Sequence, residues 1–477
     1  MRTLAGLFLD RSSRTTLQEQ LARQIKELIQ GGVLSPGDAL PSTRDVATGL
    51  NVSRNTAVNA YDRLVSEGYL EPVSRSGVFV SSSITLSPHS TWPVRQNAAR
   101  GRAPAVAPAA PAPLAAPAPF RPSQPDVSLF PLLVWNRLRS RALRLEGRNL
   151  LHYPEPCVAG PPALRQNVAA YLRDSRGVRC DWNQVVITSG SQQALFLLAS
   201  LLLGPAATAY VEDPGYVEAR LACRRTGAKV VPGPVDEQGL RLPGRPGGKV
   251  SVVYTTPSRQ FPTGVSLSLA RRLALIDYAG RTGAWVVEDD YDSELRYGAP
   301  PLPSLQSLDR SGKVIYVGTF SKLLFPSLRL SYVVVPEPLL RQFIDLKHLI
   351  DDHLPLVDQA TLALFLESGA FYSHIRRCRK AYAERQGLFL KLFADADLPV
   401  EFPYADGGMN LTGLLPDGED DEAWSRRLRD AGFDVPALSR YAIRPTRPGL
   451  VFGFTAFAPS VVRSSFSRLR RVLEAAG

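Results

Sequence analysis

A lysine that has hydroxyl and guanidinium side chains close to it in sequence is the feature of this chain best suited to chemistry. Lys322 lies in the stretch GTFSKLLFPSLRLSY, which also carries Thr319, Ser321 and Arg329. A lysine in a closed site can lose its proton and condense with an aldehyde, because desolvation disfavours the ammonium ion. Two hydroxyls and a guanidinium can hold a phosphate. A ligand with both an aldehyde and a phosphate is pyridoxal 5'-phosphate (PLP). From this segment alone, an ordinary surface lysine beside a turn is an equal alternative.

The elements that must position this lysine are strands alternating with helices, from Phe120 onward. The runs typical of buried strands are VVITSG, ATAYVED, VSVVYTTP, GAWVVEDDYDSE and KVIYVGTFSK. Such alternation predicts a mainly parallel α/β sheet, which binds ligands at the carboxyl ends of its strands. The helix after VVITSG begins at a Gly/Ser turn, so its first amides and the side chains of Ser191 and Gln192 are suited to a phosphate.

The first eighty residues have another pattern. Three short helical segments, opened by Leu17, Ser42 and Ser53, precede an alternating hairpin at residues 69–80, which predicts a winged helix-turn-helix. The segment LSPGDALPSTRDVATGLNVSRNTAVNAYDRLVSEGYL resembles the DNA-binding head of the GntR superfamily, whose third helix enters the major groove. The residues that this resemblance turns toward double-stranded DNA are Arg44, Ser53, Arg54, Asn55, Thr56 and, at the wing tip, Ser76 and Gly77. A solvated helix face is the alternative for each of them.

A stretch dense in proline and alanine separates the two patterns. The run APAVAPAAPAPLAAPAPF has no amphipathic period, so it should form an extended, semi-rigid tether. We predict a winged helix-turn-helix domain at residues 1–81, a linker at 82–119 and an α/β domain at 120–477. The last of these should contain a smaller subdomain from about residue 375 to 477.

Composition limits the possible partners. The net charge of +12 favours a polyanionic partner such as an operator DNA. No apolar run approaches the ~20 residues of a membrane helix, so no membrane contact is expected. The four cysteines form no CxxC pair and the five histidines no HExxH motif. We therefore predict no disulfide framework and no metal site, and a cytoplasmic location.

The order of the motifs GSQQAL, EDPGY, FPTG, EDDYDSE and GTFSK…R resembles the fold-type I PLP-dependent aminotransferases over roughly residues 120–477. With the head and the linker, the whole chain resembles the MocR-type subfamily of GntR regulators, the group that includes GabR and PdxR. The resemblance implies that Lys322 carries the Schiff base to PLP. It also places Asp289 against the pyridine nitrogen, Tyr291 near the phenolic oxygen and Tyr216 on the ring.

The phosphate contacts that the resemblance implies come from Ser191, Gln192, Thr319, Ser321 and Arg329. Ordinary turn and cap hydrogen bonds are the alternative for the hydroxyls among them. Asp290 is the alternative to Asp289, because side chains alternate along a strand and an error of one residue reverses the face.

Four positions depart from the family pattern. Phe261 stands where transaminases place an asparagine, Arg259 and Asn410 each stand where a histidine is common, and Val451 replaces the arginine that grips the substrate carboxylate. The arginines that could substitute for this last residue are Arg440, Arg444 and Arg447. Losing a buried, charge-assisted contact costs several kcal/mol, so efficient transamination is not expected.

We therefore expect a PLP-responsive, DNA-binding transcriptional regulator that controls vitamin B6 or amino-acid metabolism. PLP, or an amine or amino acid that reacts with it, would bias the arrangement of the DNA-binding heads. The resemblance implies a homodimer in which the head of one subunit reaches the body of the other. The competing hypotheses are an active aminotransferase with an appended DNA-binding domain, which would turn over, and a scaffold with a vestigial pocket, which would take up no cofactor.

Overall fold

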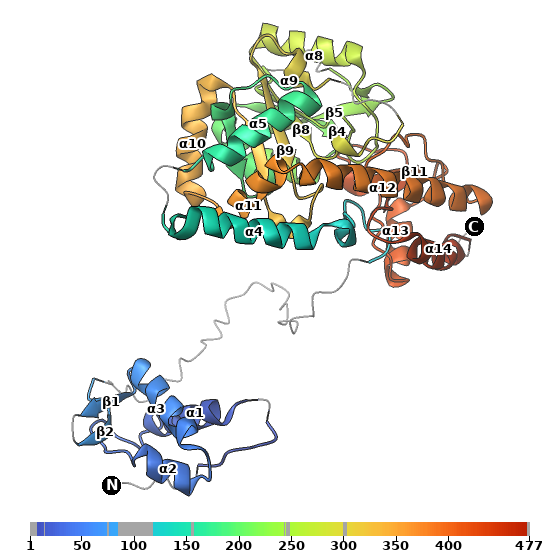
Figure 1. Ribbon diagram of the computed structural model, residues 1–477. Helices are drawn as coiled ribbons and strands as arrows, with labels where there is room; N and C mark the ends of the chain where they lie inside the picture. The colour runs from blue at the N-terminus through green and yellow to red at the C-terminus, as the bar shows by residue number, and fades with distance from the viewer. Residues whose placement is uncertain are drawn as a thin grey trace, which may run out of the picture. The chain divides into compact units, whose positions relative to one another are not determined.

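The computed structural model of this chain describes residues 7–13, 15–73, 76–83, 118–153, 157–242, 244, 249–298 and 303–474. They belong to two compact units, residues 1–111 and 112–477, which are called the head and the body below (Figure 1). The predicted linker at residues 82–119 lies mostly outside the described residues, so the domain boundaries stay a prediction.

The head consists of three helices and a two-stranded wing in its described part. Its elements are α1 (Leu17–Gln30), α2 (Thr43–Gly49), α3 (Arg54–Ser66), β1 (Leu70–Val73) and β2 (Gly77–Val80). The two strands pair antiparallel. This is the winged helix-turn-helix that the sequence predicted.

Side-chain caps and an apolar interior determine where the head's helices lie. Thr16, Ser42 and Ser53 each accept a backbone N–H at the start of α1, α2 and α3. A cap of this kind contributes about 1 kcal/mol. The helices pack on an interior that includes Leu21, Ile25, Ile29, Val46, Ala57, Tyr61, Leu64, Leu70 and Val80.

The body is built on a mixed sheet, which has eight strands among the described residues. They are β3 (Val185–Thr188), β4 (Thr208–Asp213), β5 (Lys229–Asp236), β6 (Gly239–Leu240), β7 (Val252–Thr255), β8 (Trp285–Asp290), β9 (Val314–Thr319) and β10 (Ser331–Val334). Their spatial order is β3-β10-β9-β8-β7-β4-β5-β6. Strands β5, β4, β7, β8 and β9 are parallel, and β10 pairs antiparallel with both β3 and β9. The carboxyl ends of β3, β4, β7, β8 and β9 therefore meet at one edge.

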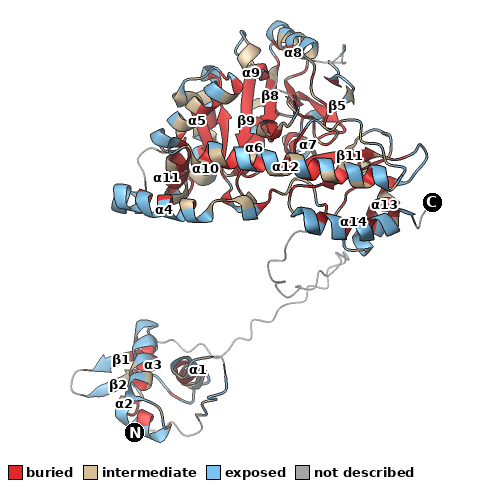
Figure 2. Cartoon of the chain, turned by 45° about the vertical axis from the view of Figure 1, so that its right-hand side comes forward, coloured by how far each residue is buried: buried red, intermediate tan, exposed pale blue. Residues whose placement is uncertain are grey.

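Helices cover both faces of this sheet. The helices of the body are α4 (Leu132–Glu146), α5 (Pro162–Arg176), α6 (Gly190–Leu202), α7 (Val217–Arg225), α8 (Leu269–Thr282), α9 (Leu305–Leu308), α10 (Glu337–Asp351), α11 (Leu356–Glu367), α12 (Ala370–Asp395), α13 (Asp421–Asp430) and α14 (Pro459–Glu474). Helices α6, α7 and α10 share one apolar cluster with Val287 and Val317, whereas α8 packs over Val286 and Val314 on the other face. Figure 2 shows the strands buried between helices whose outer sides are exposed.

A second, smaller sheet lies toward the C-terminus of the body. It pairs β11 (Asn410–Leu414) antiparallel with β12 (Gly449–Gly453), near α12, α13 and α14 (Figure 1). Phe393 of α12 is central to the packing here, with its ring 5.4 Å from that of Phe452 and 5.0 Å from that of Phe466. This aromatic cluster packs the small sheet against α12 and α14.

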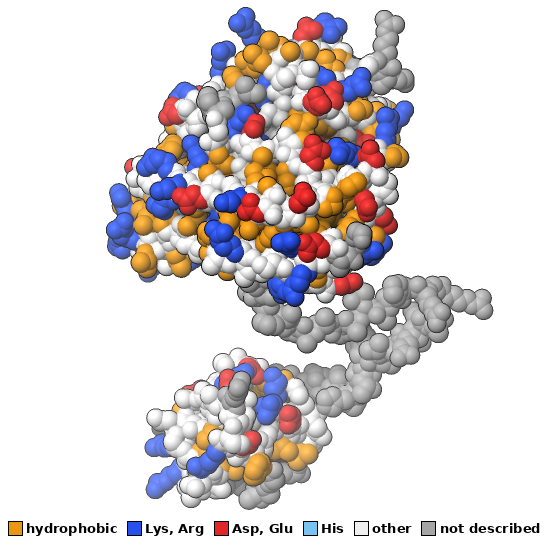
Figure 3. Space-filling view, turned by 90° about the vertical axis from the view of Figure 1, so that its right-hand side faces the viewer, with side chains coloured by type: hydrophobic (Ala, Val, Ile, Leu, Met, Phe, Trp, Pro, Cys, Tyr) orange, Lys and Arg blue, Asp and Glu red, His pale blue; other side chains and the backbone are white. Residues whose placement is uncertain are grey.

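The surface of the body is mixed in charge. On the face shown in Figure 3, Lys and Arg side chains lie among Asp, Glu and apolar ones, so the net charge of +12 is not gathered into one patch there. None of the helices in the described part of the chain has both the length and the apolar character needed to cross a bilayer.

Candidate functional site

A cavity of about 150 Å³ lies at the edge where the parallel strands end. The side chains that line it are Ser123, Ser191, Gln192, Tyr216, Tyr254, Thr256, Phe261, Asp289, Tyr291, Thr319, Ser321, Lys322, Pro326 and Arg329. All nine residues that the sequence predicted for PLP are among them, namely Ser191, Gln192, Tyr216, Asp289, Tyr291, Thr319, Ser321, Lys322 and Arg329. The fold thus brings together these nine residues, which are up to 138 positions apart in the chain.

Lys322 contributes a primary amine to the lining of this cavity. Burial lowers the pKa of its amine, and the nearby carboxylate of Asp292 opposes that effect. Its Nζ donates a hydrogen bond to the backbone oxygen of Ser123 at 3.2 Å. A buried amine with a lowered pKa is more often neutral, which is the state that attacks an aldehyde.

The alternation of side chains along β8 puts Asp289 and Asp290 on opposite faces of the sheet. Asp290 accepts from Arg176 at 2.8 Å on the face away from the cavity. Asp289 shares its face with Val287 and α6, and it lines the cavity. Of the two carboxylates between which the sequence could not decide, the cavity therefore contains Asp289.

Asp289 is held by one strong hydrogen bond. The hydroxyl of Tyr254, on the neighbouring strand β7, donates to Asp289 Oδ2 at 2.7 Å. Asp289 Oδ1 has no hydrogen-bond partner in the described part of the chain. Burial raises the pKa of this carboxyl to about 7, and the Tyr254 hydroxyl opposes the rise. An unsatisfied buried carboxylate oxygen is costly, and a protonated ring nitrogen would satisfy it.

The other end of the cavity is suited to an anion. Ser191 and Gln192 lie in the first turn of α6, where backbone N–H groups are free of helical partners. Arg329 approaches the same turn and donates to the backbone oxygen of Ser189 at 3.2 Å. A Cβ added to Gly190, which has a φ of +79°, would lie 2.3 Å from a guanidinium nitrogen of Arg329. The glycine therefore allows the guanidinium to reach the helix terminus.

The two hydroxyls beside Lys322 have different surroundings. Thr319 Oγ1 already accepts from the Ser331 hydroxyl at 2.8 Å and from the Ser321 backbone N–H at 3.1 Å. Ser321 Oγ is buried and has no partner among the described residues, and neither does Gln192 Oε1. These unsatisfied atoms, together with Asp289 Oδ1, are compatible with a polar cofactor that carries a phosphate.

Three aromatic side chains that contact one another form a wall of the cavity. Tyr216 and Tyr291 each lie edge-to-face with Phe261, with ring centroids 5.9 Å and 6.0 Å apart. Burial raises the pKa of both tyrosines above the ordinary value of 10, so both hydroxyls are neutral hydrogen-bond donors at neutral pH. Planar side chains are what contact with a flat ring requires.

Of the four residues that depart from the aminotransferase pattern, Phe261 lines the cavity and the other three do not. Arg259 is 6% exposed, lies 3.6 Å from Asp292, and donates to the backbone oxygen of Asn410 outside the cavity lining. Val451 is fully buried in β12 opposite Thr412. The three arginines considered as substitutes, Arg440, Arg444 and Arg447, do not line the cavity. Arg447 instead pairs with Glu401 at 3.2 Å.

Sequence reasoning missed several residues of the cavity. Tyr254 and Thr256 alternate at the end of VSVVYTTP, on the face that also carries Asp289, so the strand period could have identified them. Ser123 lies 199 residues before Lys322 and has no local signal. Its place in the site follows from tertiary packing alone.

The residues proposed for DNA contact lie at the surface of the head, with one exception that is half-buried. Six of them are exposed: Arg44, Ser53, Arg54, Asn55, Ser76 and Gly77. Thr56 is half-buried, and its hydroxyl lies 2.8 Å from that of Ser53, which caps α3. Thr56 therefore has a structural hydrogen bond as well as any contact with DNA.

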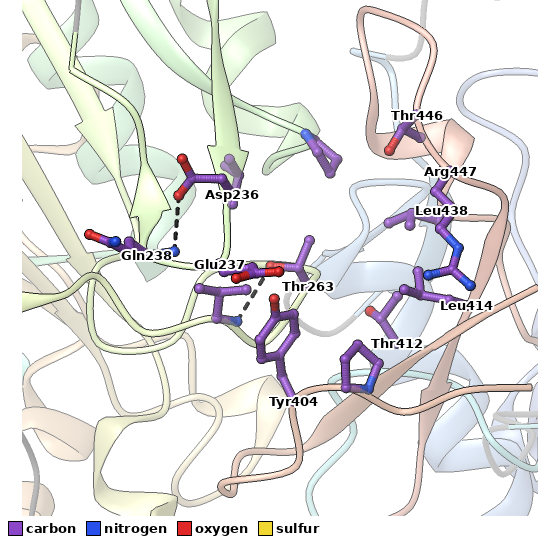
Figure 4. Close-up of a pocket in the computed structure, with 14 residues that line it drawn as sticks. Asp236, Glu237, Gln238, Thr263, Tyr404, Thr412, Leu414, Leu438, Thr446 and Arg447 are labelled. Carbon is purple, nitrogen blue, oxygen red and sulfur yellow. Dashed lines mark hydrogen bonds between the residues drawn. The ribbon is translucent and has the colours of Figure 1, made fainter.

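A second, larger cavity of about 450 Å³ lies between the two sheets of the body. Asp236 and Glu237 line one side of it, and Arg447 of the small-sheet region lines the other (Figure 4). The described residues that line this larger cavity include no lysine, so it does not have the amine that the sequence analysis singled out.

Comparisons with known proteins agree with the division of the chain into a head and a body. Residues 17–80 match the profile "Bacterial regulatory proteins, gntR family", and residues 129–446 match "Aminotransferase class I and II". The body is similar to a kynurenine aminotransferase of Pyrococcus horikoshii that was solved in complex with PMP. The TM-score is 0.70 and the identity 27%, over 76% of this chain and 92% of that one. The class is thus a DNA-binding regulator with an aminotransferase-like body.

Several relatives match along almost the whole chain, and two of them have informative names. The probable rhizopine catabolism regulatory protein MocR of Rhizobium meliloti is 37% identical over 97% of this chain and 95% of its own. The pyridoxine biosynthesis transcriptional regulator PdxR of Corynebacterium glutamicum is 32% identical over 94% of each. This chain belongs to the MocR-type subfamily of the GntR transcriptional regulators, as the sequence motifs indicated.

Proposed function

We propose that this regulator binds PLP through Lys322 and uses its body to sense the cofactor rather than to turn over a substrate. The observation that carries the proposal is the cavity that unites Lys322, Asp289 and the anion-binding turn of α6. PLP supplies an aldehyde that condenses with a primary amine and a pyridine ring that withdraws electrons. The signal is PLP itself, or an amine or amino acid that competes with Lys322 for it.

Different residues of the chain contact different groups of the cofactor in this proposal. Asp289 Oδ1 bonds the ring nitrogen, and Tyr254 holds that carboxyl in place. The wall of aromatic side chains keeps water away from the ring. The phosphate is held by Ser191, Gln192, Thr319, Ser321 and Arg329, near the α6 terminus.

The absence of a suitable carboxylate anchor argues against efficient transamination. Among the described residues, the only guanidinium that lines the cavity is Arg329, which lies at the anion-binding end. The alternative, an active aminotransferase with an attached DNA-binding head, is favoured by the similarity of the body to aminotransferases. Sustained keto-acid production from an amino acid would establish that alternative, whereas a single stoichiometric exchange supports the sensor.

We further propose that the protein works in the cytoplasm as a homodimer. Leu349, Leu151 and Tyr153 of the body are 80%, 73% and 88% exposed. Tyr153 also stacks edge-on against His353 at 5.9 Å, close to the end of α10 that carries Leu349. Exposed apolar side chains gathered in this way mark a protein contact, and a second copy is the partner that the family resemblance implies. Each head would reach the body of the other subunit, and two heads bind two DNA half-sites.

Reduction of the PLP-loaded protein with borohydride tests the cofactor site. We expect one covalent adduct, on the peptide that contains Lys322, and none in Lys322→Ala. As a matched control, Lys347→Ala removes another fully buried lysine that lies in α10 and bonds Asp351 at 2.7 Å. This control should keep the adduct, and an adduct on another lysine would refute the assignment.

A further inference from the structure

The chain enters the body through a segment that contributes Ser123 to the lining of the cofactor cavity. We call residues 118–126 the entry strap. The backbone oxygen of Phe120 accepts from Gly453 at 2.8 Å, which ties the strap to β12. At its other end, Asp126 pairs with Arg385 at 2.7 Å. Ser123 lies between these anchors and lines the cavity.

Ser123 has an unusual conformation that its neighbours hold in place. Its φ of +61° is in the left-handed region, which serine rarely adopts. Its backbone N–H donates to Asn410 Oδ1 at 2.5 Å, and Asn410 Nδ2 donates to Ser123 Oγ at 3.2 Å. Its backbone oxygen accepts from Lys322 Nζ at 3.2 Å. A strained residue that is fixed from two sides beside a reactive group points to a functional constraint.

We propose that Ser123 and Asn410 are positioning residues that hold the free amine of Lys322, and that the entry strap thereby detects whether this amine has reacted. The inference rests on the proposed function. Condensation joins the Lys322 nitrogen to the aldehyde carbon and releases the aldehyde oxygen as water with both hydrogens of the neutral amine. The Ser123 oxygen then loses its donor, and Asn410 alone holds the left-handed turn.

The loss of this hydrogen bond would affect the chain on the N-terminal side of Ser123. The entry strap continues directly, toward the N-terminus, into the chain that leads to the head. A loosened strap would change how the body holds the start of that connection. The covalent state of one lysine would thus be transmitted by a backbone hydrogen bond rather than by a large motion of the sheet.

Hydrogen exchange of the full-length protein, read by mass spectrometry on peptides that cover residues 118–126, tests this inference. In the wild type, PLP should accelerate exchange of the strap by at least about fivefold, because one of its anchors is lost. Lys322→Ala should show the faster exchange without PLP. Lys322→Arg keeps an N–H donor but cannot condense, so its strap should stay protected and ignore PLP. Unchanged exchange in Lys322→Ala would overturn the inference.

A second pair of variants separates positioning from general stability. Asn410→Ala should give a fast-exchanging strap that PLP no longer changes. It should also move the pH profile of borohydride trapping to lower pH, because the charged amine loses its oxygen acceptor. The control Thr412→Val alters the same strand at a hydroxyl that bonds Pro262 and not the strap, and it should behave as the wild type. Equal shifts in both variants would overturn the positioning role.

The proposed function and this inference can fail separately. If the wild type forms no covalent adduct with PLP, the proposed function is wrong. If the adduct forms and strap exchange is unchanged, the cofactor site stands and the role of Ser123 and Asn410 is wrong.

Discussion

Replacing Asp289 by asparagine should stabilise the cofactor-free protein at alkaline pH. This carboxyl is buried, one of its oxygens has no partner in the described structure, and its pKa is raised to about 7 from 3.8. A carboxyl whose pKa rises on folding does not lower the free energy of unfolding below about pH 4, where the folded and unfolded states are both protonated. It lowers this free energy most above pH 7. The shift corresponds to at most ~4 kcal/mol, and the cost grows by ~2–3 kcal/mol between pH 5 and pH 8. Asparagine removes the charge and still accepts from Tyr254.

Urea unfolding at pH 5 and pH 8, followed by tryptophan fluorescence, measures this effect. The predicted head at residues 1–81 has no tryptophan, so the signal reports on the rest of the chain. The stability gain of Asp289→Asn over the wild type should be larger at pH 8 by ~2–3 kcal/mol. Asp290→Asn is the matched control, because it breaks a buried ion pair with Arg176 at 2.8 Å and should destabilise by ~3–5 kcal/mol. The reasoning is refuted if Asp289→Asn gains nothing at pH 8, or gains equally at both values.

Three further predictions concern other parts of the molecule. Arg54→Ala should lower affinity for the selected DNA sequence by ~1–3 kcal/mol at one base pair, and an equal loss on random duplex would reduce Arg54 to a phosphate contact. Gly190→Ala should weaken PLP binding at least about tenfold in equilibrium dialysis, because the new methyl would lie 2.3 Å from a guanidinium nitrogen of Arg329 and displace it, and unaltered affinity would contradict the anion site. Tyr254→Phe removes the hydroxyl that lowers the pKa of Asp289, so the fall in stability of the cofactor-free protein should begin at the same pH but continue to higher pH, and a fall that ends at the wild-type pH would contradict this coupling.

Many helices and strands of this chain could be predicted from its sequence, because local interactions determine where they begin and end. The head's helices begin at Ser42 and Ser53, because each hydroxyl caps the backbone N–H groups of the next turn. The strands that position the cavity are short apolar runs that end in polar residues. The order of their motifs was enough to identify the family, which the long alignment with a MocR protein then established.

What the sequence left open depended on three-dimensional packing. The choice between Asp289 and Asp290 required knowing which face of β8 receives α6, and the strand period alone cannot supply that. Arg259, which stands where a histidine is common, is buried beside Asp292 and the backbone of Asn410, and these contacts have no signal in the local sequence. Ser123 reaches the site from a distant segment, so it was invisible to any local pattern.

The most direct test of the central claim is a titration of DNA binding with PLP. The full-length protein would bind a duplex that it has itself selected from a random pool, and the dissociation constant would be measured with and without PLP for the wild type and Lys322→Ala. The account predicts that PLP changes the affinity of the wild type and leaves that of the variant unaltered. A wild type that ignores PLP, or a variant that responds equally, would contradict it.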